Sequence, residues 1–177
     1  MIFIQDVTIV KSLASKIKLL LLDVDGVLTD GRLYFSNSGE EIKAFHTLDG
    51  HGIKMLMSTG IEVGIITGRT STLLEKRARD LGIELLYQGR EDKLNVFHEI
   101  LADRKLASEQ ICYAGDDLPD LPVLKKVGLG FTVPLGHVSV KSAVQAITEF
   151  QGGQGAVREI TDFILQAQGN YDQFLDD

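Results

Sequence analysis

Short apolar runs alternate with longer amphipathic stretches along most of this 177-residue chain. The apolar runs expected to form buried strands are 19–22, 63–66, 84–87, 111–114 and 129–133. The amphipathic stretches expected to form helices are 52–58, 70–81, 92–105 and 118–127. Continuous apolar strands that alternate with helices are typical of a parallel sheet covered on both faces. Right-handed crossovers then predict an α/β, Rossmann-like three-layer fold, whose ligands bind beyond the carboxyl ends of the strands.

Two segments interrupt this alternation. Residues 31–45 contain two apolar stretches around Asn37-Ser38-Gly39, which predicts a β-hairpin inserted between the first strand and the first helix. Residues 151–177 form a tail that begins with a glycine-rich loop and continues as an amphipathic run over 156–168. Such a loop can present backbone N–H groups to an anion, but its spacing favours a flexible joint before a docking helix. The expected organisation is a single domain over residues 1–177.

Composition and charge narrow the class of partner. The chain has 18 basic and 25 acidic residues, so its formal net charge is −7. This balance argues against a nucleic-acid binder or a protein of anionic membrane surfaces, because both need a basic face. The single cysteine, Cys112, excludes an intrachain disulfide, and no segment resembles a signal peptide or a membrane span, so a cytoplasmic location is expected. An acidic chain that handles a phosphorylated substrate needs a local cation.

Acidic residues follow two of the predicted strands. Asp23 and Asp25 come directly after four leucines, where two carboxylates on one face of a strand would repel each other. Asp116, Asp117 and Asp120 follow another apolar run at a predicted helix start, where a single acid would suffice as a cap. If both strands are central, Asp23, Asp25 and Asp116 converge at one edge of the sheet. Oxygen ligands without histidine or cysteine favour Mg²⁺.

Polar residues also follow the two other central strands. Thr67-Gly68-Arg69 offers a hydroxyl and unhindered backbone amides, and Lys93 stands at the start of a predicted helix. In isolation Lys93 would be interpreted as an ordinary surface lysine. Together with the acids, these groups are the parts that phosphoryl transfer needs, because its catalysis is mostly positioning and charge neutralisation.

These motifs, in this order, resemble those of the haloacid dehalogenase (HAD) superfamily. The residues that carry the resemblance are Asp23-x-Asp25-Gly-x-x-Thr29, Thr67, Lys93 and Gly115-Asp116-Asp117-x-x-Asp120. Longer stretches at 25–31, 39–46, 49–54 and 152–159 are similar to the 3-deoxy-D-manno-octulosonate (KDO) 8-phosphate phosphatases, a capless family of that superfamily. The similarity covers residues 18–169.

The resemblance implies a catalytic mechanism. Asp23 would attack phosphorus, and Asp25 would protonate the leaving alcohol and then activate water. Asp23, the backbone carbonyl of Asp25, and Asp116 would hold Mg²⁺. Asp117 and Asp120 would orient the metal ligands.

The same resemblance implies how substrate is bound. Thr67 and Gly68 would bind phosphoryl oxygens, and Lys93 would bridge the nucleophile and the phosphate. The candidate substrate-binding residues are Gly68, Arg69, Arg77, His46, Asp49 and Arg158. Of these, Arg77 can equally be interpreted as a solvated helix residue.

The implied activity is hydrolysis of KDO 8-phosphate in lipopolysaccharide precursor synthesis. Leu48 departs from the family pattern, which commonly has arginine before the Asp49-Gly50 pair, so a nine-carbon keto-deoxy acid 9-phosphate remains an alternative substrate. A phospho-aspartate receiver module is the alternative from another class, although in receivers the lysine follows the acids. Because no cap domain fits between the motifs, the site would be open to water unless another subunit covers it. The resemblance to the capless family implies a homotetramer, in which we expect the hairpins to pair and the subunits to cover one another's sites.

Overall fold

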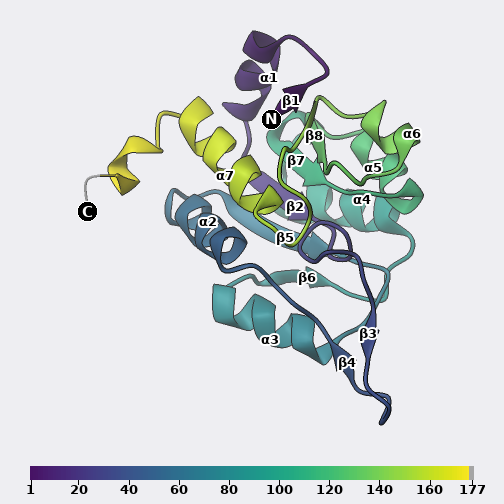
Figure 1. The fold of residues 1–177 in the computed structure, drawn as a ribbon. Coiled ribbons are helices and arrows are strands. Elements are labelled where there is room, and N and C mark those ends of the chain that lie inside the picture. Colours follow the sequence, from purple (N-terminus) through teal and green to yellow (C-terminus); the bar gives the residue numbers. More distant parts are fainter. Residues whose placement is uncertain (176–177) are drawn as a thin grey trace.

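The computed structural model describes residues 1–175 and contains one seven-stranded sheet with a separate two-stranded hairpin (Figure 1). The strands of the sheet are β1 (Ile2–Phe3), β2 (Leu19–Leu22), β5 (Glu62–Ile66), β6 (Leu85–Tyr87), β7 (Ile111–Ala114), β8 (Leu129–Thr132) and β9 (Ala146–Ile147). Their spatial order is β1-β9-β8-β7-β2-β5-β6, and all pairs are parallel except β1 with β9. The predicted parallel α/β sheet is therefore confirmed.

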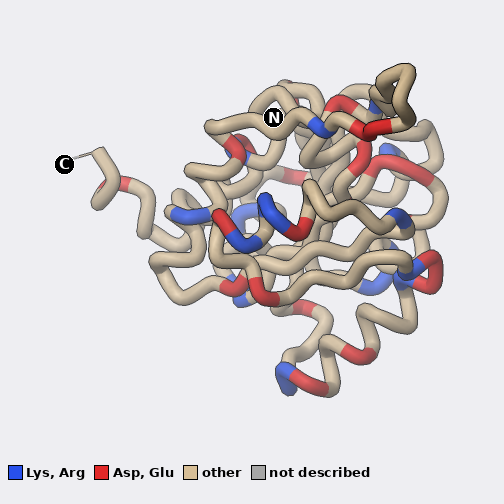
Figure 2. Tube along the Cα trace, turned by 90° about the horizontal axis from the view of Figure 1, so that it is seen from below, with Lys and Arg blue, Asp and Glu red and all other residues tan. Residues whose placement is uncertain are grey.

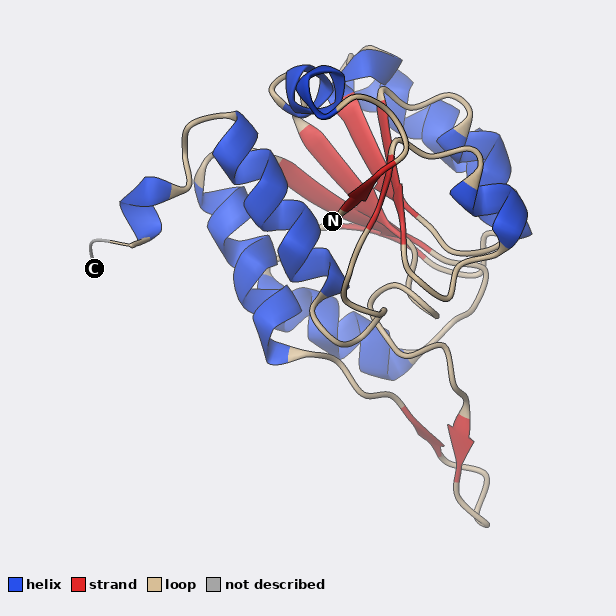
Figure 3. Ribbon diagram, turned by 45° about the horizontal axis from the view of Figure 1, so that its top comes forward, coloured by secondary structure: helices blue, strands red, loops and turns tan. Residues whose placement is uncertain are grey.

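Helices cover both faces of this sheet, which gives three layers (Figure 3). They are α1 (Val7–Ala14), α2 (Thr47–Ser58), α3 (Thr72–Leu81), α4 (Lys93–Arg104), α5 (Leu121–Leu124), α6 (Val138–Lys141) and α7 (Ala156–Ala167). Short 3₁₀ turns lie at η1 (Ser108–Gln110), η2 (Leu118–Asp120) and η3 (Asp172–Phe174). Within residues 1–175, no helix has both the length and the apolar character that a membrane crossing requires.

The four leucines of β2 explain how the layers are joined. Leu20 and Leu22 pack with α1, α2, α3 and α7, whereas Leu19 and Leu21 pack with α4, α5 and α6 on the other face. All four side chains are completely buried, and each such burial stabilises the fold by about 1.5–3 kcal/mol. Because β2 pairs with β5 on one side and β7 on the other, it is an interior strand, and the residue that follows it lies between the carboxyl ends of two neighbouring strands.

Two predicted helix boundaries were wrong, each for a local reason. Helix α2 begins at Thr47, before the predicted start at Gly52, because its glycines serve packing rather than helix termination. A Cβ at Gly50 would lie 2.2 Å from Nη2 of Arg77, and one at Gly52 would lie 2.3 Å from Oγ1 of Thr161. The predicted helix over 118–127 is instead η2 followed by the four-residue α5, since it contains two prolines.

The hairpin is present but shorter than predicted. Its strands are β3 (Tyr34–Phe35) and β4 (Glu41–Ile42), which pair with each other and extend away from the sheet (Figure 1). The short strands β1, at one edge of the sheet, and β9, next to it, were not predicted, and neither were helices α1 and α6.

The glycine-rich loop before α7 packs tightly, so the expected flexible joint was wrong. A Cβ at Gly152 would lie 1.8 Å from the carbonyl oxygen of Gly26. The backbone N–H of Gly153 donates to the carbonyl oxygen of Val27 at 3.0 Å. These contacts hold the loop against the turn that follows β2. Residues 176 and 177, at the end of the predicted tail, lie outside the described residues.

Candidate active site

A cavity of about 820 Å³ opens at the carboxyl ends of β2, β5 and β7. The predicted site residues that line it are Asp23, Asp25, Thr67, Gly68, Arg69, Lys93, Asp116, Asp117 and Asp120. They come from four separate stretches of the chain, and the parallel register brings them together. Leu22 of β2 lies opposite Ala114 of β7, so Asp23 and the acidic loop after β7 begin side by side.

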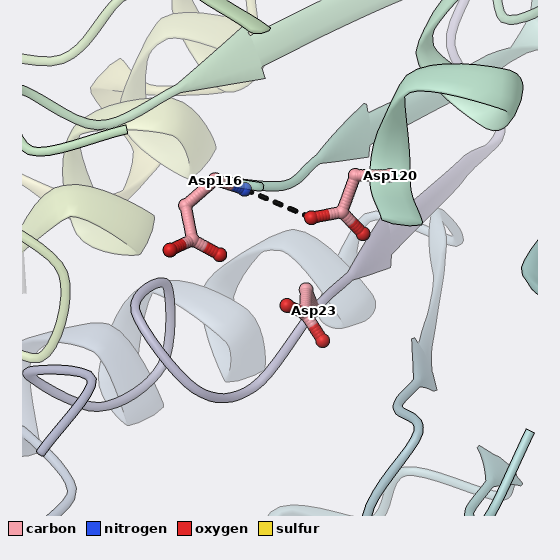
Figure 4. A group of neighbouring side chains, drawn as sticks. All are labelled: Asp23, Asp116 and Asp120. Atoms are coloured by element: carbon pink, nitrogen blue, oxygen red, sulfur yellow. Dashed lines mark hydrogen bonds between the residues drawn. The ribbon is translucent and has the colours of Figure 1, made fainter. Parts of the chain in front are cut away.

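Three carboxyl groups in this cavity lie close enough to share a metal ion. Asp23, Asp116 and Asp120 each place one carboxylate oxygen within 4.8 Å of the others (Figure 4). Three carboxylates face the single ammonium of Lys93, so the fully ionised cluster carries an excess of negative charge. Oxygen-only donors with this charge fit a hard divalent cation such as Mg²⁺.

Lys93 is held between two of these carboxylates. Its Nζ lies 2.9 Å from Oδ1 of Asp23 and 2.7 Å from Oδ1 of Asp120. Tyr113, in β7, donates its hydroxyl to the same Asp120 oxygen at 2.6 Å. Burial opposes the charge on Lys93, but Asp23 and Asp120 outweigh it and raise the pKa of the ammonium above its usual value. The lysine therefore stays charged inside the cleft.

The acids themselves are electrostatically unfavourable when no cation is bound. Burial, together with the charge of Asp120, raises the pKa of Asp23 to about 6 despite Lys93. Burial and the charges of Asp23 and Asp120 raise the pKa of Asp116 to about 7. A cation at this place would favour the ionised carboxylates, so binding of the cation and loss of protons are linked.

Two glycines make room for this cluster. Gly26 has a φ of +96°, and a Cβ there would lie 2.2 Å from Oδ2 of Asp116. A Cβ at Gly115 would lie 2.4 Å from Cγ of Asp120. The Asp-Gly pair of the first motif and the Gly-Asp pair of the second therefore have a steric basis.

Asp120 organises the loop that carries Asp116. Its Oδ2 accepts the backbone N–H of Asp116 at 3.0 Å and that of Asp117 at 3.2 Å. Asp117 in turn caps η2 by accepting the N–H of Leu118 at 2.8 Å. Asp120 is fully buried, so its carboxylate is fixed by these donors and by Lys93.

The turn after β5 supplies polar groups to the opposite side of the cavity. Thr67 is buried, and its backbone N–H donates to the carbonyl oxygen of Tyr87 at 2.9 Å. Its hydroxyl oxygen accepts the N–H of Arg69 at 3.2 Å. Gly68 lies open to the cavity, near Glu91.

Asp25 is held by residues from outside the sheet. Lys43, which follows strand β4, donates a hydrogen bond to Oδ1 of Asp25, and Nε of Arg69 lies 3.6 Å from Oδ2. Sequence reasoning missed Lys43. The only signal was a lysine within the 39–46 stretch that resembles the family, and nothing in its spacing distinguished it from a surface lysine.

The remaining predicted substrate-binding residues lie outside the cavity of this chain. His46 caps α2 by accepting the N–H of Leu48 at 3.2 Å through Nδ1. Arg77 donates to the carbonyl oxygen of His46 at 3.2 Å and stacks over Phe45. Both contacts serve the junction between the hairpin and α2.

Asp49 and Arg158 join two helices. Asp49 is buried in α2, and its Oδ1 accepts the backbone N–H of Arg158 at 2.8 Å, close to the start of α7. Burial raises the pKa of Asp49, while hydrogen bonds from the α7 backbone lower it. The Nε of Arg158 lies 2.7 Å from Asp162, and Arg158 lines a separate pocket of about 330 Å³ together with Leu48. Leu48, where the family commonly has arginine, therefore lines that pocket and not the cavity around Asp23.

Comparisons with known proteins agree with these features. No protein-family model matches the chain. The chain is 50% identical over 155 residues to the 3-deoxy-D-manno-octulosonate 8-phosphate phosphatase KdsC of Yersinia pestis, covering 88% of this chain and 83% of the relative.

Solved structures are similar over nearly the whole fold. The Moraxella catarrhalis 3-deoxy-D-manno-octulosonate 8-phosphate phosphatase, in complex with magnesium, phosphate and KDO, has a TM-score of 0.94 at 39% identity, covering 96% of this chain and 98% of that one. A putative HAD superfamily (subfamily III A) hydrolase from Legionella pneumophila has a TM-score of 0.92 at 42% identity, covering 95% and 92%. The motifs, the fold and these identities together show that the chain belongs to the KdsC family of HAD-superfamily phosphatases.

Proposed function

We propose that this protein is a Mg²⁺-dependent phosphomonoesterase that hydrolyses KDO 8-phosphate to KDO and phosphate for lipopolysaccharide precursor synthesis in the cytoplasm. The observation that carries the proposal is the cluster of Asp23, Asp116 and Asp120 around Lys93 in one cavity. Membership of the KdsC family supports the choice of substrate. So does the structurally similar Moraxella catarrhalis enzyme, which was solved with magnesium, phosphate and KDO.

The proposed metal ligands are the carboxylates of Asp23 and Asp116 and the backbone carbonyl of Asp25. When bound, Mg²⁺ supplies positive charge that neutralises the nucleophile and the phosphoryl group. Asp120 and Asp117 position this set, since Asp120 binds both Lys93 and the backbone of the loop that carries Asp116.

The proposed reaction has two steps. First, a carboxylate oxygen of Asp23 attacks phosphorus, the P–O bond to the sugar breaks, and Asp25 gives its proton to the departing alcohol oxygen. Then water attacks the phosphoryl group on Asp23 and Asp25 takes a proton from that water. Phosphate leaves, and both side chains return to their starting state. Lys93, the Thr67 hydroxyl and the Gly68 amide bind the phosphoryl oxygens in both steps.

Arg69 is the proposed contact for the acidic sugar. Its side chain is 44% exposed at the rim of the cavity, within reach of a substrate carboxylate. The cavity is open, so we also propose that the single domain of residues 1–177 assembles as a homotetramer whose subunits cover one another's sites. The hairpin extends from the body with exposed apolar residues, among them Phe35 and Ile42, which suits pairing with other copies. Such an assembly would also bring Arg158 of one subunit close to the site of a neighbouring subunit.

Phosphate release from a panel of sugar phosphates, with and without Mg²⁺, tests this function. We expect KDO 8-phosphate to be the preferred substrate, with no turnover after Mg²⁺ is removed. Asp23→Asn should lower kcat by about 10⁴-fold or more, because an amide cannot act as the nucleophile. Preference for a nine-carbon keto-deoxy acid 9-phosphate would favour the alternative substrate, which remains because Leu48 stands where the family commonly has arginine. Full activity of Asp23→Asn would contradict the mechanism.

A further inference from the structure

We propose that Lys43 is a positioning residue that holds the carboxyl group of Asp25 in its working orientation, so that the root of the hairpin takes part in proton transfer. The inference rests on the proposed function, because it assigns Lys43 a role through the residue that donates and accepts the proton. The contacts that carry it lie between the hairpin segment and the turn that follows β2.

The carboxyl group of Asp25 depends on few partners. Among the described residues, Lys43 is the one hydrogen-bond donor to this carboxylate, and Arg69 adds an ion pair at 3.6 Å. By contrast, the Asp120 carboxylate accepts from two side chains and two backbone N–H groups. Asp25 must reach both a departing alcohol and an incoming water, so a rotation of its side chain would misplace the proton.

The Lys43–Asp25 pair is unlike an ordinary surface ion pair. The Lys43 side chain is only 4% exposed, and that of Asp25 is 21% exposed. A buried ammonium loses its hydration, so it needs a partner that replaces water. Exposed ion pairs contribute little, because solvent and salt screen both charges, and that screening is weaker for a buried ammonium. The ammonium of Lys43 therefore depends on the carboxylate of Asp25.

Glu41 links this pair to the rim of the site. Its Oε1 lies 3.8 Å from Nζ of Lys43 and 2.9 Å from Nη2 of Arg69. Glu41 belongs to β4, so a hairpin strand supplies the residue that holds both cations around Asp25. Two acids and two bases form a continuous network, in which Lys43 is the buried member and Arg69 the exposed one.

Two substitutions at Lys43 test the proposal. Lys43→Met keeps the length of the side chain and removes the ammonium, whereas Lys43→Arg keeps the positive charge. With KDO 8-phosphate we expect Lys43→Met to lower kcat by about 10–100-fold with KM within about threefold, since general acid–base catalysis is worth about 10²–10⁴-fold. Lys43→Arg should recover part of that loss. Lys11→Met, an exposed lysine on α1, is the matched control and should leave kcat unchanged.

A second substrate distinguishes a loss of proton donation from a general loss of activity. The leaving group of p-nitrophenyl phosphate needs little protonation, so Lys43→Met should lose less in the first step with this ester than with the alkyl ester. The second step still needs Asp25 as a base. We therefore expect a burst of nitrophenolate followed by slow turnover, because phosphorylated Asp23 accumulates.

A double-mutant cycle distinguishes action through Asp25 from an independent structural effect. In the Asp25→Asn background, adding Lys43→Met should change kcat by less than about twofold. A loss that multiplies in full in that background would overturn the proposal, and so would a Lys43→Met enzyme with wild-type kcat on KDO 8-phosphate. If wild type hydrolyses p-nitrophenyl phosphate but not KDO 8-phosphate, the proposed substrate is wrong. The cycle on p-nitrophenyl phosphate then still decides the role of Lys43.

Discussion

Asp23 and Asp25 are two residues apart, yet different parts of the molecule support them. Asp23 follows the central strand β2 and pairs with Lys93, which is held in turn by the fully buried Asp120. Asp25 pairs with Lys43 from the hairpin segment and with the exposed Arg69. The proposed nucleophile is thus fixed by the core, and the proposed acid–base group by an insertion that extends from it (Figure 1). Substitutions in the core should therefore impair the attack on phosphorus and the binding of the phosphoryl group, whereas substitutions in the hairpin should impair proton transfer.

The largest effect is expected from the core side. Lys93→Ala leaves Asp23 and Asp120 buried without their ammonium, so we expect kcat to fall by about 10³-fold or more. The same change should lower the free energy of unfolding by about 3–5 kcal/mol, because breaking a buried ion pair leaves an uncompensated charge. Kinetic assays at saturating Mg²⁺ and urea denaturation measure the two quantities. Lys126→Ala, at an exposed lysine, should change neither. A loss confined to KM would show that Lys93 acts only in substrate binding.

Asp116→Asn separates metal binding from stability. We expect it to weaken Mg²⁺ binding by about 10²-fold, because it removes a charged ligand. Without metal, the same variant should melt a few degrees higher than wild type. The pKa of Asp116 is raised to about 7 in the folded protein, so ionisation of this group destabilises the fold as pH rises from about 4 to about 7.

The effect of Asp116→Asn on stability should depend on pH. The advantage of Asp116→Asn over metal-free wild type should be small at pH 4.5 and larger at pH 8, measured by calorimetry in a chelating buffer. Mg²⁺ should raise the melting temperature of wild type more at pH 8 than at pH 6, since binding releases protons. An advantage that shrinks as pH rises would contradict the assigned electrostatics.

The core side of the site was more predictable from sequence than the hairpin side. Four leucines followed by an acid identify a buried central strand and its functional end, and parallel pairing then fixes where Asp23 and Asp116 meet. Lys43 follows a two-residue strand of a short hairpin. Strands this short have no hydrophobic periodicity from which to predict which side chain points toward Asp25. Its partner is 18 residues away along the chain, so only the folded structure shows the pair.

The tail shows the same limit. The spacing of Gly152 and Gly153 does not distinguish a flexible joint from a close approach of two backbones. The structure shows the latter, with Gly152 against the carbonyl of Gly26. Asp49 lies outside the cavity around Asp23 and accepts hydrogen bonds from the start of α7. Its predicted contact with substrate stays a prediction. The hydrogen-bond partners of a buried acid on one helix cannot be identified from sequence until the position of the neighbouring helix is known.

The distribution of charged residues over the chain agrees with a site whose positive charge comes from a few residues in and around the cavity. Acidic and basic segments are interspersed along the chain rather than separated into two faces (Figure 2). The net charge of −7 would repel an anionic substrate at long range. In the proposed function, the cations that would meet a phosphate are those of the cavity, Lys93 and a bound divalent ion, with Arg69 at the rim.

A change at the tip side of the hairpin should have an intermediate effect. Phe35 is 62% exposed in a single chain, so Phe35→Asp costs the isolated fold little. If hairpins pair in the assembly, the buried charge should shift the tetramer toward smaller species and lower kcat on KDO 8-phosphate by about 10-fold, because the sites become more open to water. Light scattering and kinetics measure both. Leu135→Asp, at a residue that is 73% exposed, is the control and should leave the mass unchanged. A fully active monomeric Phe35→Asp protein would exclude a role for assembly.

The smallest effect is expected behind the cluster of Asp23, Asp116 and Asp120, where one hydroxyl supports Asp120. Tyr113→Phe removes the 2.6 Å hydrogen bond but leaves Asp120 with Lys93 and two backbone N–H groups. We expect kcat to fall about threefold and the free energy of unfolding to fall by about 1 kcal/mol. Tyr34→Phe is the matched control on the hairpin, because Tyr34 donates a hydrogen bond of 2.7 Å to Asp30 at the surface. If Tyr34→Phe lowered kcat as much as Tyr113→Phe, the hydrogen bond from Tyr113 to Asp120 would support the site no more than a hydrogen bond at the surface does. A loss at Tyr113 alone would place the support for Asp23 in the core.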